Sequence, residues 1–146
     1  MRKGEITKTM IRQSKEIWEL LKPDEFEPEP GDWISTLHIY KWLMYEPNYI
    51  DERGNLRDKW YSMIQFGNDD WHPIFTFSHC LDLLGKRGWY QETGEHTSDH
   101  GFRYMGERYY YHIRVEHVDD DIIFACEPNH HEAAQAVLLK VLKGES

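Results

Sequence analysis

The sequence predicts an α+β fold, with one antiparallel sheet and helices packed as two layers or as an αβα sandwich. The first observation is the alternation of apolar and polar residues over 107–117, which is typical of a strand. The second is a turn-like acidic segment at 118–121 followed by an apolar run at 122–126, which completes a hairpin. The third is helical spacing of apolar residues over 129–143. This strand, strand and helix unit anchors the predicted fold.

The N-terminal segment 5–22 has the spacing of an amphipathic helix. We expect the helix to stop at Pro23, because proline cannot continue the hydrogen-bond ladder. An acidic, proline-rich loop follows at 23–32. The predicted apolar stripe of the helix consists of Ile6, Met10, Ile17 and Leu21.

The middle of the chain has weaker patterns. Residues 33–45 fit a helix and a strand about equally by spacing, and their β-branched and aromatic content favours strand. Within 56–66, a strand is expected at 60–66. Further strands are expected at 89–92 and 102–105, the latter pairing with the segment that follows it.

Two later helices carry end signals. The helix at 78–88 has Thr76 or Ser78 as its N-cap, since a hydroxyl can accept from the free amides of the first turn. The last helix begins with Asn129 and Glu132 in capping-box spacing. Its predicted buried face is Ala134, Val137, Leu138, Val141 and Leu142. The glycines expected to end these helices are Gly85, Gly88 and Gly144.

The composition fits a single domain spanning 1–146. Only 40% of the 146 residues are hydrophobic, but 14% are aromatic, and large rings bury much area each. No apolar run reaches the ~20 residues that a membrane span needs, and no apolar signal segment is present. We therefore expect a cytoplasmic protein with no membrane association. Cys80 and Cys126 lie in apolar contexts and are expected to be buried thiols.

The chain is acidic, with a formal net charge of -9. This charge opposes direct binding to nucleic acid, whose phosphates attract clustered Lys and Arg. One acidic group comprises Asp119, Asp120 and Asp121 in the hairpin turn. Such a group is either a solvated turn or part of an acidic surface that engages a basic partner.

Nine histidines suggest a metal site as an alternative. His96, Asp99 and His100 place three potential ligands in five residues, as in a metal-assisted hydrolase. Their spacing matches none of the strong zinc patterns, however, and no common catalytic motif is present. We therefore expect surface and capping histidines and no cofactor.

The polar side of the strand at 107–117 is the leading candidate binding surface. Arg108, Tyr110, His112 and Arg114 fall on it by parity. An outward aromatic ring beside cationic groups can stack on a nucleotide-like small molecule or on a protein side chain. The alternatives are a sheet covered by helices on both faces, or a homo-oligomer contact at Tyr110.

Residues 68–143 resemble the phage ABA-sandwich domain family. The resemblance rests on the Trp71-x-Pro73 segment, the helix containing Ser78-His-Cys-Leu-Asp-Leu-Leu84, and Gly88-Trp89. After two strands, the chain continues with Ala125 and the alanine-rich helix His130-x-Glu-Ala-Ala-Gln-Ala-Val-Leu-Leu139. The resemblance implies the α+β fold given above and a viral origin, and it supplies no catalytic residues.

These observations predict a small, non-enzymatic phage or prophage accessory protein. It would act by binding a basic host protein or a nucleotide-like small molecule, and would inhibit a host defence system. The alternatives are the metal-assisted hydrolase described above and an oligomeric structural component.

Overall fold

The computed structural model shows an α+β protein, as predicted. The residues it describes are 3–22, 24–29, 32–35, 39–41, 49–50, 53, 56–57, 71–91, 101–105 and 108–145. The chain divides into two compact units. The first combines Met1–Leu21 with Phe75–Ser146, and the second is Lys22–Ile74.

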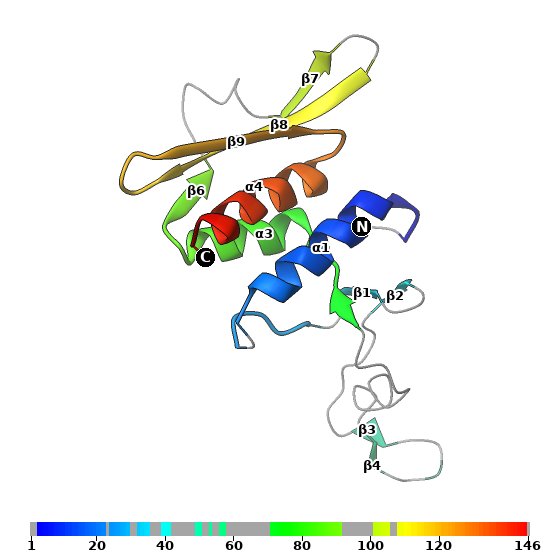
Figure 1. Ribbon diagram of the computed structural model, residues 1–146. Coiled ribbons are helices and arrows are strands. Elements are labelled where there is room, and N and C mark those ends of the chain that lie inside the picture. The colour runs from blue at the N-terminus through cyan, green and yellow to red at the C-terminus, as the bar shows by residue number, and fades with distance from the viewer. Residues whose placement is uncertain are drawn as a thin grey trace. The chain divides into compact units, whose positions relative to one another are not determined.

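The first unit contains the described helices and the largest sheet (Figure 1). Its elements are a 3-10 turn at Lys3–Glu5, α1 at Lys8–Leu20, α3 at Phe77–Gly85, β6 at Trp89–Gln91, β7 at Gly101–Met105, β8 at Arg108–His117, β9 at Ile122–Glu127 and α4 at His130–Glu145. The hairpin of β8 and β9 and the terminal helix α4 confirm the predicted unit.

Strand β8 is the centre of this antiparallel sheet. Its start pairs with β7, from Arg108 opposite Met105 to His112 opposite Gly101. Its end pairs with β6, where His117 lies opposite Trp89. Strand β9 pairs with the middle of β8. Because β9 overlaps both of these pairings, it must lie on the opposite side of β8 from β6 and β7.

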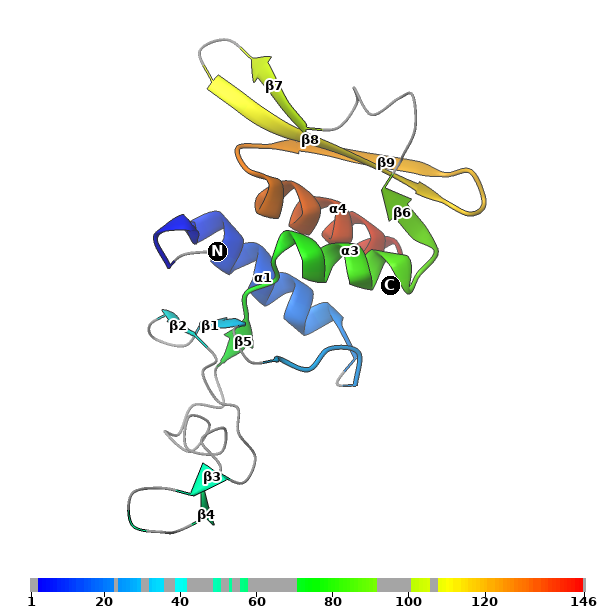
Figure 2. The ribbon, with the colours of Figure 1, turned by 180° about the vertical axis from the view of Figure 1, so that it is seen from behind.

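All three helices of this unit lie on one face of the sheet, in both views of the ribbon (Figures 1 and 2). Helix α4 packs against β8, β9 and α3, and α1 packs on α4. Helix α4 is accordingly buried nearly all round, as expected for a helix with neighbours on several sides. The five residues predicted for its core face are all buried. Of the two expected arrangements, the described elements form the one with helices on a single face.

Side-chain caps fix where the helices begin. The Thr7 hydroxyl accepts a hydrogen bond from the Met10 amide, so α1 starts at Lys8 and the predicted start at residue 5 is wrong. Thr76 caps α3 as predicted, with His79 completing a capping box. The Asn129 side chain accepts from the Glu132 amide at the start of α4. The predicted stop at Gly144 is wrong, because α4 continues to Glu145.

A buried polar cluster joins the two chain segments of the first unit. The Ser14 hydroxyl on α1 accepts from the Phe75 amide at 3.0 Å. The Gln135 amide nitrogen on α4 donates to Ser14 Oγ at 3.1 Å and to the Phe75 carbonyl at 2.6 Å. Ser14 and Gln135 are fully buried. These bonds hold α1 against α4 in a fixed register.

The second unit contains short antiparallel strands. A three-stranded sheet has the order β2-β1-β5, and β3 pairs with β4. Their bounds are Trp33–Ser35 for β1, Ile39–Lys41 for β2, Tyr49–Ile50 for β3, Leu56–Arg57 for β4 and His72–Pro73 for β5. The weak preference for strand near residue 33 is confirmed, whereas the expectation of one sheet is wrong. The strand predicted at 60–66 lies outside the described residues.

Candidate functional site

The face of the β6–β9 sheet opposite the helices is the candidate site, and we call it the outer face. Side chains alternate between the two faces of a strand. Ile113 and Val115 on β8 are fully buried on the helix side, so the residues between and after them face outward. The outer face carries Tyr90, Tyr110, His112, Arg114, Glu116, Ile122, Phe124 and Cys126.

Three large apolar side chains of the outer face are exposed to solvent. Tyr90 is 57% exposed, Ile122 44% and Phe124 59%. Exposed rings and aliphatic groups gathered on one face are typical of interaction surfaces. No described helix or strand covers this face, although α4 covers the opposite one.

Two cross-strand pairs form the centre of the outer face. Arg114 lies opposite Phe124, and Glu116 lies opposite Ile122. The His117 amide donates to the Asp121 carbonyl at 2.8 Å, so the hydrogen-bonded positions of this ladder are the odd-numbered residues of β8. The two central pairs are therefore of the non-hydrogen-bonded kind, in which facing side chains lie closest together.

A shallow depression lies on the outer face. Its volume is about 420 Å³ and its lining residues are His112, Arg114, Ile122 and Phe124. The rings of His112 and Phe124 have centroids 5.9 Å apart and are inclined by 37°. An aromatic surface beside a guanidinium group can hold a planar or anionic group, or a partner's side chain.

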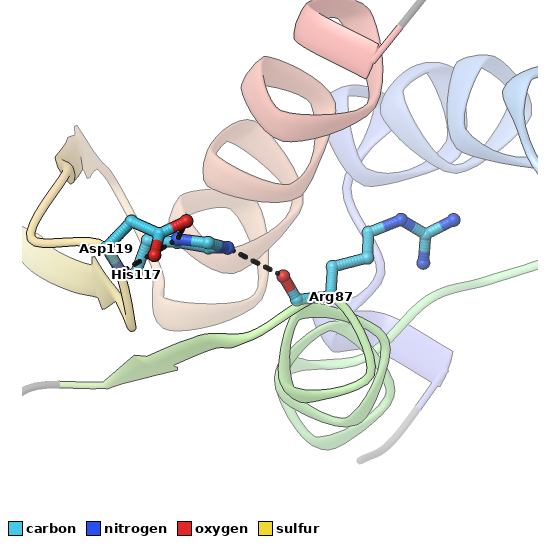
Figure 3. Close-up of polar contacts among 3 residues, drawn as sticks. All are labelled: Arg87, His117 and Asp119. Carbon is cyan, nitrogen blue, oxygen red and sulfur yellow. Dashed lines mark hydrogen bonds and ion pairs between the residues drawn. The ribbon is translucent and has the colours of Figure 1, made fainter.

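The acidic hairpin turn lies at the end of the outer face. Its conformation depends on His117, whose Nε2 donates to the Arg87 carbonyl at 3.1 Å (Figure 3). Since an amide can only donate, Nδ1 of the same ring accepts from the Asp119 amide at 3.1 Å. A carboxylate oxygen of Asp119 lies 3.4 Å from Nδ1. The three aspartates of the turn, Asp119, Asp120 and Asp121, are exposed to solvent.

One of the two histidines at the start of α4 caps the neighbouring helix α3. His131 Nδ1 accepts from the Phe77 amide at 2.9 Å, in the first turn of α3. Burial lowers the pKa of His131 to about 4, and the nearby His130 lowers it further. Burial also lowers the pKa of His130, while the Glu5 carboxylate opposes the change. The capping role expected for histidines is confirmed at His79 and His131.

Cys80 and Cys126 are not joined in a disulfide. Cys80 is fully buried on α3, and burial raises the pKa of its thiol far above the usual range. Such a thiol is a poor nucleophile, because the thiolate is the reactive form. Cys126 on the outer face is only half-buried, so the expectation of a buried thiol is confirmed for Cys80 alone.

The structure brings together some of the predicted site residues. Tyr110, His112 and Arg114 share the outer face, and Arg108 belongs to the same strand β8. His96, Asp99 and His100 lie outside the described residues, so the metal-site alternative stays a prediction. Within the described part of the chain, no group of three His, Cys, Asp or Glu side chains is placed to hold a metal ion.

The sequence-based prediction missed Ile122 and Phe124 of the outer face. Every residue from Ile122 to Cys126 is apolar, so parity alone could not say which side chains of β9 face outward. The pairing of Phe124 with Arg114 supplies that information. The alternation on β8 would have located them once the hairpin register was known.

Comparison with known proteins gives no match. Neither the protein-family models, nor the curated proteins, nor the solved structures contain a significant relative of this chain. Among the described residues, no helix is long and apolar enough to cross a bilayer.

Proposed function

We propose that this chain is a small, non-enzymatic binding protein that engages a partner through its outer face. The observation that carries the proposal is the exposure of Tyr90, Ile122 and Phe124 on the face that no described element covers. Aromatic side chains of this kind supply much of the affinity at protein interfaces, because each buries a large area at little entropic cost.

A basic protein is the partner that best fits this face. The acidic turn at its end carries three exposed aspartates, and the side chain of Asp119 is 80% exposed. The whole chain has a formal net charge of -9. Opposite charge on a partner would steer its approach, and the apolar side chains would then supply the contact area.

The biological setting we propose is a phage or prophage protein acting in the cytoplasm of the host cell. The resemblance of residues 68–143 to the phage ABA-sandwich family supports this setting. A small acidic protein that blocks a basic host factor would suit the role of an inhibitor of host defence.

The test is capture of a partner from a bacterial extract, followed by direct measurement of binding to the purified partner. We expect Phe124→Glu to weaken binding at least tenfold, since it places a charge where a ring is buried in the complex. Ser78→Glu is the matched control, because it also adds one negative charge but lies at an exposed position of α3 on the helix side. Equal binding by the Phe124→Glu variant and the unmodified chain would contradict the proposal.

The second candidate is a nucleotide-like small ligand, favoured by the depression beside Arg114 and Phe124. A base would stack on the ring of Phe124, and the guanidinium of Arg114 would bind a phosphate. In that case, a panel of mononucleotides and cyclic dinucleotides would include one that raises the melting temperature of the unmodified chain. Arg114→Ala would abolish the rise. No rise with any member of the panel would exclude this candidate for those ligands.

A further inference from the structure

We infer that a second copy of this chain packs on the outer face when no other partner is bound. The inference rests on the proposed function for the claim that this face binds. It adds that the face is complementary to itself, and that self-association competes with partner binding.

The complementarity follows from the central four residues of the outer face. Arg114 on β8 is paired with Phe124 on β9. Glu116, two residues further along β8, is paired with Ile122. The four side chains therefore form a square, with two opposite charges along one edge and two apolar groups along the other. Val115, which is fully buried on the helix side, lies midway between the two charged residues of β8.

The square matches a second copy that is related by a two-fold axis. This axis lies in the plane of the interface and crosses β8 at right angles at Val115. The rotation exchanges the two ends of β8 and keeps β9 over β9. Arg114 then faces Glu116 of the second copy, and Phe124 faces Ile122 of the second copy. Both kinds of contact occur twice, as a two-fold interface requires.

Sheet packing geometry permits this arrangement. Packed sheets lie about 10 Å apart and cross at about 30°. The residues of the square lie within about 6 Å of the point where the axis crosses β8. This distance follows from a rise of ~3.3 Å per residue along a strand and a spacing of ~4.8 Å between strands. A 30° crossing displaces them by only about 3 Å, which long side chains can span. Tyr90 lies opposite Glu116 on the other side of β8 and extends the contact.

The size of the face predicts a weak dimer. Strand β8 has 10 residues and is therefore about 33 Å long. Three strands abreast are about 14 Å wide, so the projected area is roughly 450 Å² per copy. About 900 Å² in total lies below the usual range of stable complexes and within that of transient ones. Such a dimer would dissociate readily when a tighter partner is present.

Charge exchange gives a specific test by sedimentation velocity over micromolar to submillimolar concentrations. The unmodified chain is expected to show a rising weight-average sedimentation coefficient as concentration increases. Arg114→Glu places two carboxylates face to face, and Glu116→Arg places two guanidinium groups face to face. We expect each variant alone to associate at least about tenfold more weakly.

An equimolar mixture of the two variants restores both opposite-charge contacts in a heterodimer, so we expect the mixture to associate like the unmodified chain. Recovery of association in the mixture would also show that each variant is folded, and that the single variants fail to associate because of their charges. Asp82→Arg is the control, because it changes the net charge as Glu116→Arg does but lies on α3, on the helix side of the sheet. It should associate at least as well as the unmodified chain.

Three outcomes would overturn the inference. They are a chain that is monomeric at all concentrations, single variants that associate like the unmodified chain, and a mixture that remains monomeric. None of them bears on the capture of a host partner, whose dependence on Phe124 is measured separately. If the unmodified chain forms the dimer but captures no host partner, the proposed function is contradicted and the inference of a dimer is not.

Discussion

Replacement of Ser14 by alanine tests how the first unit is held together. The Ser14 hydroxyl is the acceptor for the Phe75 amide and for the Gln135 side-chain amide, and it is fully buried. Ser14→Ala removes an acceptor from two buried donors. Each buried donor that loses its acceptor costs about 1–3 kcal/mol, and the better helix propensity of alanine returns about 0.5 kcal/mol. We expect a loss of about 3 kcal/mol in the free energy of unfolding.

Gln135→Met is expected to cost less than Ser14→Ala. The substitution removes two donated hydrogen bonds, but it also removes Gln135 Oε1, a buried oxygen with no hydrogen-bond partner among the described residues. Loss of that unsatisfied oxygen offsets part of the cost, and methionine keeps a similar volume. We expect a net loss of about 1 kcal/mol.

Urea unfolding followed by circular dichroism at the helical band is the appropriate assay, because α1, α3 and α4 belong to the first unit. With an m value of about 2 kcal/mol per molar, Ser14→Ala should lower the midpoint by about 1.5 M. Ser78→Ala, at an exposed position of α3, is the control. The reasoning is refuted if Ser14→Ala behaves like this control, or if Gln135→Met proves the more damaging change.

Two further predictions concern the histidines that fix local structure. The pKa of His131 is lowered to about 4 from 6.5, so the fold favours its neutral form. Its contribution to stability is complete above pH 6.5 and is lost as the pH falls towards 4. Because the ring is only half-buried, we expect a loss of about 1–2 kcal/mol, and urea unfolding of His131→Gln should show a smaller dependence over this range. Gly88 has a φ of +81°, and a Cβ there would lie 3.0 Å from Nε2 of His117. Gly88→Ala should therefore cost about 1–2 kcal/mol in the same assay, and an unchanged midpoint would contradict this account of the turn.

The elements with a clear hydrophobic period were predictable from the sequence. The alternation that gave β8 and the helical spacing that gave α4 both reflect one buried face of a regular element. The start of α1 was predicted too early, because Ile6 fits the apolar stripe although the Thr7 cap begins the helix after it. Local spacing cannot show which of two overlapping signals determines the boundary.

The contacts between distant segments were not predictable. His131 caps α3 although 54 residues separate it from Phe77. No spacing rule reports such a contact, and a histidine pair at the start of a helix could equally suggest a metal site. The outward direction of Phe124 likewise depends on a register set by tertiary packing. The residues that make the outer face a candidate site were therefore the hardest to identify.

The edge of β9 offers a second route to association, and its chemistry argues against that route. In the described part of the sheet, β9 has β8 as its only neighbour, so its other side is an edge. Phe124 is in a non-hydrogen-bonded pair, and its carbonyl consequently points towards this edge. Lys140 of α4 donates to that carbonyl at 2.8 Å. A lysine at this position blocks the addition of another strand, as charged groups on edge strands commonly do. The edge is closed at the residue whose ring is most exposed on the outer face, so the dimer that we propose would form through the face and not through the edge.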